Sequence, residues 1–135
     1  MIVEDNQADV FLIRESIESI HLEVDFQVLR DGEQAVRLFD QIAGGLSSVC
    51  PDVVILDLNL PKIPGRDVLH HIRQSRPCAH TIVIVVTSSN SERDRDEMAQ
   101  LGVSAYFRKP SDYAEFMKLG GLVKNLLAEN QNTSS

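Results

Sequence analysis

The stretch DVVILDLNLPKIPG, residues 52–65, decides the fold. Four apolar residues follow Asp52 without interruption, which is typical of a strand that is buried on both faces. The strand then ends in Asp57, shortly before a turn that contains proline and glycine. This stretch therefore predicts a buried parallel strand that carries a carboxylate at its tip, and the role of that carboxylate has to be found in the rest of the chain.

Composition limits the class of protein. The chain has 135 residues, of which 43% are hydrophobic, enough for one domain with a single core. Its net charge of -7 excludes a general attraction to nucleic acid or to an anionic membrane and favours proteins or cations as partners. No apolar run is long enough to cross a bilayer, and the first residues lack the features of a signal peptide. We therefore expect a cytoplasmic protein with no nucleic-acid or membrane partner.

The two cysteines, Cys50 and Cys78, lie far apart in the sequence and show neither a CxxC nor a Cys/His spacing. In a cytoplasmic chain this pattern favours reduced thiols over a metal site or a redox pair. We therefore expect both thiols to be free.

Hydrophobic residues alternate along the chain between a strand period and a helix period. Strands are expected near residues 1–3, 24–28, 52–57, 81–87 and 103–107, and helices near residues 8–20, 35–42, 66–76, 91–102 and 112–128. Apolar strands that alternate with helices, without hairpin signals between them, predict a doubly wound parallel sheet covered by helices on both faces. Gly120 and Gly121 fall inside the last helix, where each disfavours helical structure, so we expect a kink there.

Ligands of such sheets bind at the carboxyl ends of the strands. The side chains expected at those ends are Glu4, Asp5, Asp57, Thr87, Ser88 and Lys109. Carboxylates held ~4 to 5 Å apart repel by a few kcal/mol per pair, so the three acids need a cation. Mg²⁺ prefers carboxylate and phosphate oxygens, Lys109 adds a fixed positive charge, and Thr87 adds a hydroxyl donor. These groups together predict phosphoryl transfer.

Four motifs carry a family resemblance. VEDN (3–6), ILDLNLPKIPG (55–65), VVTSS (85–89) and AYFRKP (105–110) follow four of the expected strands in order. Together they resemble the CheY-like receiver domain of two-component response regulators, over essentially the whole chain. The pattern is most similar to the stand-alone type found among cyanobacterial phytochrome response regulators. This resemblance implies a flavodoxin-like α/β fold with five strands in the order 2-1-3-4-5 and five helices.

The resemblance also implies a phosphorylation site with a metal. Asp57 would accept a phosphoryl group from the phosphohistidine of a sensor histidine kinase, of the phytochrome-like type. Asp5 and Asp57 would bind Mg²⁺ directly, Asn59 would bind it through its backbone carbonyl, and Glu4 would act through a metal-bound water. The domain would be no enzyme in the ordinary sense, since it would promote only the phosphorylation and dephosphorylation of its own Asp57.

The remaining residues implied by the resemblance belong to a conformational switch. Lys109 would contact the phosphoryl group, and Thr87 and Tyr106 would be the hydroxyl and aromatic members of the switch. Pro110 would follow a cis peptide bond. The signal would pass to a downstream protein, or to a second copy of the chain, through the face formed by the fourth helix, the fifth strand and the fifth helix.

Two arrangements of the whole protein stay open. We expect a receiver domain over residues 1–128 and a polar tail over residues 129–135. Only three residues precede Glu4, so residues before Met1 could be missing, and only LAENQNTSS follows the apolar part of the last helix. The chain is therefore either a single-domain regulator that acts by protein contact or the receiver fragment of a larger regulator whose output domain is absent.

Three other functions are less favoured. A flavodoxin-type electron carrier needs a Ser, Thr and Gly-rich phosphate loop after the first strand, whereas this chain has EDNQAD (4–9), which would repel a phosphate. A haloacid-dehalogenase-like phosphatase needs a second acid two residues after the first, where this chain has Asn59. A DNA-binding regulator needs an output domain, and the polar residues after the last helix have no basic character.

Overall fold

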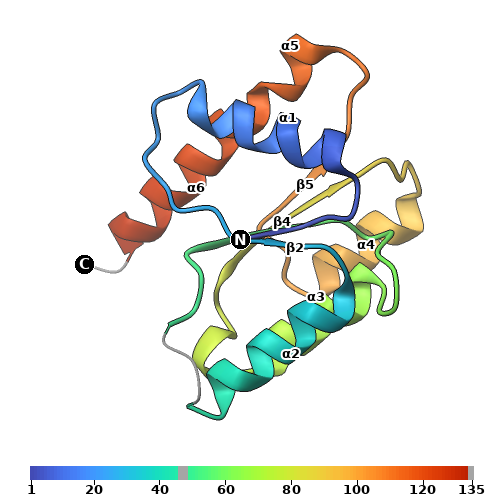
Figure 1. The fold of residues 1–135 in the computed structure, drawn as a ribbon, viewed down its shortest axis with the longest axis vertical. Helices are drawn as coiled ribbons and strands as arrows, with labels where there is room; N and C mark the ends of the chain where they lie inside the picture. The colour runs from blue at the N-terminus through green and yellow to red at the C-terminus, as the bar shows by residue number, and fades with distance from the viewer. Residues whose placement is uncertain (46–48, 134–135) are drawn as a thin grey trace.

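The computed structural model describes residues 1–45 and 49–133 (Figure 1). The strands are β1 (Ile2–Val3), β2 (Val28–Leu29), β3 (Val53–Leu56), β4 (Ile82–Thr87) and β5 (Ala105–Arg108). The helices are α1 (Gln7–Glu18), α2 (Gly32–Ala43), α3 (Gly65–Gln74), the short 3₁₀ helix η1 (Arg76–Cys78), α4 (Glu92–Gln100), α5 (Tyr113–Phe116) and α6 (Lys118–Thr133).

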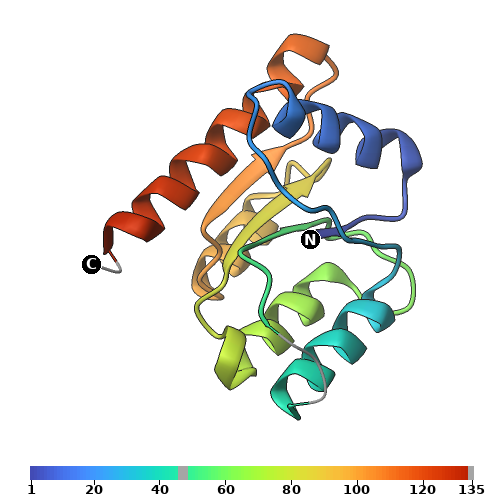
Figure 2. The same cartoon turned by 60° about the vertical axis from the view of Figure 1, so that its left-hand side comes forward.

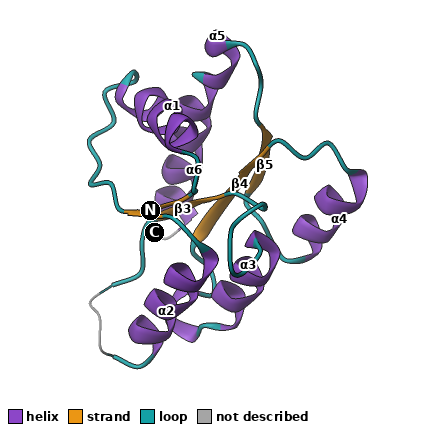
Figure 3. Ribbon diagram, turned by 45° about the vertical axis from the view of Figure 1, so that its right-hand side comes forward, coloured by secondary structure: helices purple, strands orange, loops and turns teal. Residues whose placement is uncertain are grey.

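The strands form one parallel sheet in the order β2-β1-β3-β4-β5, which confirms the predicted fold class. Helices α1, α5 and α6 cover one face, and α2 and α3 cover the other (Figures 1 and 2). Colouring by secondary structure shows the sheet enclosed between these two helical layers (Figure 3). Because all strands run in the same direction, their carboxyl ends meet at one edge of the sheet.

The unbroken apolar run of β4 explains this sandwich. All six residues of the strand are buried, and successive side chains point to opposite faces. Val83 and Val85 join the core under α2 and α3, while Ile84 and Val86 join the core under α1 and α6. A strand with two apolar faces is stable only between two helical layers, as the sequence predicts.

Three boundaries differ from the expected ones. β2 starts at Val28 rather than near residue 24, and Val24 is 39% exposed, so its apolar side chain does not mark a strand there. The last helix is interrupted at Met117 rather than at Gly120 and Gly121. Helix α6 then continues to Thr133, beyond the expected end of the last helix near residue 128.

Gly120 lies where α6 crosses α1. A Cβ at this position would overlap the backbone carbonyl oxygen of Ser16 in α1. A Cβ at Gly121 would have no atom within 4 Å. The first glycine is therefore required by the close approach of two helices, whereas the second is not.

The expectation of free thiols is wrong, because Cys50 and Cys78 form a disulfide. The fold places their Cα atoms 5.6 Å apart, although 28 positions separate them in the sequence. Cys78 lies in η1, where the chain after α3 turns back toward the segment that leads into β3, and its side chain is buried in the core. Sequence spacing carries no information about this approach, because disulfide formation depends on distance in the folded chain.

Candidate functional site at the carboxyl edge of the sheet

Three acids gather at the carboxyl edge of the sheet. Glu4 and Asp5 follow β1, and Asp57 follows the neighbouring strand β3. One carboxylate oxygen from each lies within 4.8 Å of the others. Glu4 and Asp57 are buried, whereas Asp5 is exposed. The cluster thus opens to solvent on the Asp5 side, and its three oxygen donors fit a hard divalent cation.

Lys109, at the end of β5, reaches into this cluster. Its Nζ donates to Glu4 Oε1 at 2.6 Å, to Asp9 Oδ2 at 2.7 Å and to Asp57 Oδ2 at 3.2 Å. An ammonium group has three hydrogens, so all of its donor capacity is used. The lysine therefore neutralises part of the negative charge that the acids concentrate at this edge.

Asp9 is a member of the site that sequence reasoning missed. It lies in the first turn of α1, and its backbone N–H donates to Asn6 Oδ1, the N-cap of that helix, at 3.1 Å. The available signal was an acid in the first helical turn after EDN. Acids are common at this position because the positive end of the helix dipole stabilises a negative side chain, so the signal did not single out Asp9.

Burial and the neighbouring charges together shift the pKa values of Glu4 and Lys109. Burial raises the pKa of Glu4 to about 8, and the hydrogen bond from Lys109 opposes the shift while nearby Asp57 adds to it. Burial alone would lower the pKa of Lys109, but its hydrogen bonds to Asp9 and Glu4 outweigh burial and raise the pKa above the usual value for lysine. The other Glu4 oxygen, Oε2, accepts from the backbone N–H of Asp5 at 3.1 Å.

The turn after β3 fixes the Asp57 carboxylate. The backbone N–H of Asn59 donates to Asp57 Oδ1 at 3.3 Å. The N–H of Gly65 donates to the carbonyl of Leu58 at 2.9 Å, and a Cβ on Gly65 would overlap the carbonyl oxygen of Asp57. The glycine at the end of the opening motif is thus required because the start of α3 passes close to the chain at Asp57.

Thr87 and Tyr106 are linked through Ser89, which was not predicted as part of the site. Thr87 is fully buried at the end of β4, and its Oγ1 accepts from the Ser89 N–H at 3.3 Å. The Tyr106 hydroxyl donates to the Ser89 carbonyl at 3.3 Å. The Ser89 hydroxyl in turn donates to Asp94 Oδ2 in α4 at 2.6 Å, and the Arg95 guanidinium lies 5.0 Å from the centroid of the Tyr106 ring. Ser88 is exposed.

The expected cis bond before Pro110 is not present, since none of the described peptide bonds is cis. Trans is the more stable form even before proline. Lys109 is held instead by its backbone N–H, which donates to the Thr87 carbonyl at 2.8 Å, and by its three acidic partners.

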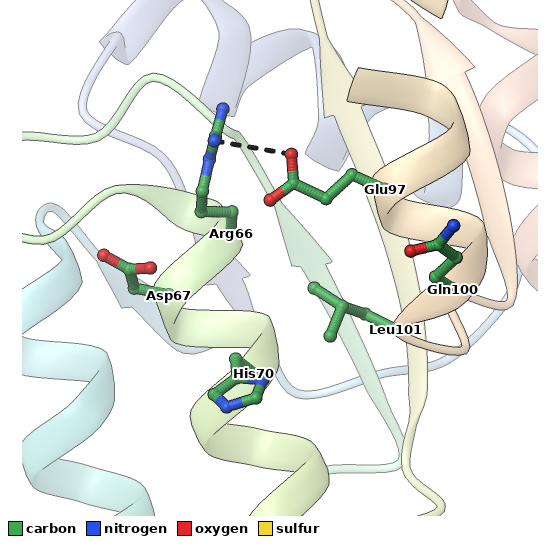
Figure 4. A pocket seen from close by; sticks show the side chains of 6 residues that line it. All are labelled: Arg66, Asp67, His70, Glu97, Gln100 and Leu101. Carbon is green, nitrogen blue, oxygen red and sulfur yellow. Dashed lines mark ion pairs between the residues drawn. The ribbon is translucent and has the colours of Figure 1, made fainter. Parts of the chain in front are cut away.

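A separate cavity of about 310 Å³ lies between α3 and α4 (Figure 4). Arg66 points across it and pairs with Glu97 at 3.4 Å. Its lining also includes Asp67, His70, Gln100 and Leu101. None of these residues belongs to the cluster of Glu4, Asp5 and Asp57, so the cavity and the acid cluster are separate features.

Within the described part of the chain, no helix is both long and apolar enough to span a membrane.

Comparisons with known proteins agree on one family. The family described as "Response regulator receiver domain" matches residues 1–119. The response regulator Rcp1 of Synechocystis sp. is 33% identical over 119 residues, which cover 88% of this chain and 81% of Rcp1. Its solved Mn²⁺-bound form aligns with a TM-score of 0.82 at 32% identity, over 93% of this chain and 91% of that one.

Two further solved structures are similar. The phosphorylated cyanobacterial phytochrome response regulator RcpA aligns with a TM-score of 0.81 at 31% identity, over 91% of this chain and 89% of that one. The receiver domain of the sensor histidine kinase PA1611 from Pseudomonas aeruginosa has a magnesium ion in its active-site cleft. It aligns with a TM-score of 0.68 at 25% identity, over 95% of this chain and 92% of that one. Together with the cluster of Glu4, Asp5 and Asp57, these structures support binding of a divalent metal.

Proposed function

The chain belongs to the family of response regulator receiver domains, and from this premise we propose that Asp57 accepts a phosphoryl group from the phosphohistidine of a sensor histidine kinase. Receiver domains of this kind are phosphoacceptors in two-component signalling and interact with histidine kinases. The observation that carries the assignment is the buried Asp57 carboxylate, which lies within 4.8 Å of two further acids and 3.2 Å from the Lys109 ammonium.

The chemistry requires one nucleophilic oxygen and neutralisation of charge. An oxygen of Asp57 forms a bond to phosphorus as the bond from phosphorus to the kinase imidazole nitrogen breaks, and the imidazole keeps the electron pair. Lys109 donates to the phosphoryl oxygens and offsets their charge. Asp5, Asp57 and the Asn59 carbonyl would hold Mg²⁺, with Glu4 acting through a bound water. The bound ion would supply positive charge beside the phosphoryl oxygens.

Phosphorylation by a small donor tests this function. Wild-type protein incubated with acetyl phosphate and Mg²⁺ should gain the mass of one phosphoryl group, and mild base should remove it, as expected for an acyl phosphate. Chelation of the metal by EDTA should prevent the gain. A protein that gains no mass with metal and donor in excess would contradict the proposal.

Asp5→Asn should weaken Mg²⁺ binding by about tenfold or more, because a direct carboxylate ligand is replaced by a neutral amide. Glu4→Gln should weaken binding less, because its contact is proposed to pass through water. Titration calorimetry with Mg²⁺ measures both affinities. Equal affinity in wild type and Asp5→Asn would remove Asp5 from the metal site.

The signal is proposed to leave through the face of α4, β5 and the last helical segment, which the structure divides into α5 and α6. A phosphoryl group on Asp57 carries about two negative charges on its oxygens, and the Thr87 hydroxyl would move toward it as a donor. Ser89 contacts both Thr87 and Tyr106, so this movement would change the hydrogen bond that holds Tyr106. The altered face would bind a downstream protein or a second copy of the chain.

Thr87→Ala should still be phosphorylated but should lose most of the conformational change that phosphorylation causes in α4 and β5. Amide NMR spectra of residues 88–108, recorded with and without beryllofluoride as a phosphoryl mimic, measure the effect. Wild type should show shift changes across α4 and β5, and Thr87→Ala should show much smaller ones. Identical changes in the two proteins would mean that coupling does not run through Thr87.

Two finer assignments complete the proposal. The same site would also promote hydrolysis of its own aspartyl phosphate, so the signal would decay without a separate phosphatase. The kinase would be of the phytochrome-like type, which the similarity to Rcp1 and RcpA supports. We place this exchange in the cytoplasm, where the ATP that phosphorylates the kinase is available.

A further inference from the structure

Lys109 has three acidic partners, but they are not equivalent. Glu4 and Asp57 both belong to the cluster that can hold a metal. Asp9 accepts from the Lys109 ammonium through Oδ2 at 2.7 Å, but it is not among the three acids whose oxygens lie close enough together to hold a metal. We propose that Asp9 is a positioning residue for Lys109. The Asp9 carboxylate would hold the Lys109 ammonium in the site when Asp57 carries the phosphoryl group and Glu4 serves the metal. The inference rests on the proposed phosphorylation of Asp57.

The need for such an anchor follows from competition for oxygen atoms. In the structure the Lys109 ammonium takes one oxygen from Glu4 and one from Asp57. Once Asp57 carries a phosphoryl group, the ammonium exchanges the Asp57 oxygen for phosphoryl oxygens. Glu4 would then face the water on a divalent cation, and that cation would repel the ammonium. Of the three carboxylate partners, Asp9 is the one that would stay bound to the lysine without also serving the metal or the phosphoryl group.

Position and burial make Asp9 suitable for this task. The Asn6 cap fixes the first turn of α1, so Asp9 approaches the ammonium from the helix while Lys109 reaches it from the end of β5. The Lys109 side chain is 12% exposed and that of Asp9 is 21% exposed. Water therefore screens this pair less than a surface ion pair, and a charge-assisted hydrogen bond there orients the lysine side chain.

Asp9→Asn tests the inference, since the amide keeps the shape but removes the charge. At saturating Mg²⁺, the rate of phosphorylation by acetyl phosphate should fall about tenfold or more, as expected for loss of one hydrogen bond between charged groups. The affinity for Mg²⁺ should change by less than about threefold, because Asp9 is not a ligand. Asp9→Glu, which keeps the charge, should recover most of the rate. Glu18→Gln, at the far end of α1, controls for the change in net charge and should react like wild type.

A double-mutant cycle shows whether Asp9 acts through Lys109. In a Lys109→Ala background, Asp9→Asn should lower the remaining rate by less than about twofold, because the group it positions is gone. Thermal unfolding checks each variant, and an unfolded Asp9→Asn protein would count against a positioning role. Independent losses in the cycle, or a wild-type rate in Asp9→Asn, would overturn the inference. Failure of the proposed function gives a different result, since then the wild-type protein itself would gain no phosphoryl group.

Discussion

Asp57→Asn should gain no phosphoryl group from acetyl phosphate or from a phosphorylated histidine kinase, and it should remain folded. The amide has no anionic oxygen to attack phosphorus, yet it has nearly the same shape and can still accept the hydrogen bond from the Asn59 N–H. The carboxylate is 6% exposed and lies in a cluster with two further acids, so its removal relieves repulsion there.

Intact mass after incubation with donor and Mg²⁺ measures this effect, and thermal unfolding checks the fold. Asp52→Asn is a suitable control, because Asp52 precedes the same strand at its opposite end and should leave phosphorylation unchanged. If Asp57→Asn gained the phosphoryl mass as fully as wild type, another residue would be the acceptor.

Gly120→Ala should destabilise the protein by about 1–3 kcal/mol, the usual cost of forcing a methyl group into a packed core. The added Cβ would overlap the Ser16 carbonyl oxygen, which is backbone and cannot rotate away, so α6 would have to move off α1. This cost should exceed the gain of about 1 kcal/mol that alanine brings to a helix interior relative to glycine.

Gly121→Ala is the matched control for this prediction. It lies in the same helix with no atom within 4 Å of an added Cβ, so only the helical gain remains and the protein should become more stable by about 0.5–1 kcal/mol. Denaturant unfolding of the two variants measures the difference. Destabilisation of equal size at both positions would show that helix propensity, not packing against Ser16, governs this region.

The features that were predictable from sequence depend on local periodicity. The apolar run of β4 requires that both faces of the sheet be covered. The apolar residues 53–56 form β3, and Asp57, which follows them directly, is therefore placed at the carboxyl edge. Once the parallel sheet is inferred, Glu4 and Lys109 must meet Asp57, because their strands end at the same edge. The convergence of residues from three distant segments was therefore predictable.

The features that were missed depend on distances between segments. The Cys50–Cys78 disulfide, the approach of Asp9 to Lys109 and the contacts of Ser89 each join groups whose meeting no spacing rule describes. The kink in the last helix shows the same limit, because helix propensity points to Gly120 as a weak position. In the structure this glycine lies inside α6 and serves close packing against α1.

Borohydride trapping identifies the phosphorylated residue directly, because borohydride reduces an acyl phosphate to an alcohol and so converts a phosphoaspartate to homoserine. Wild-type protein treated with acetyl phosphate and Mg²⁺, then with borohydride, would be digested and its peptides sequenced by mass spectrometry. Homoserine is expected at position 57 and at no other acid of the cluster. Homoserine at Asp5 or Asp9 with Asp57 unchanged, or no conversion in protein that carries the phosphoryl mass, would contradict the assignment of Asp57 as the phosphoacceptor.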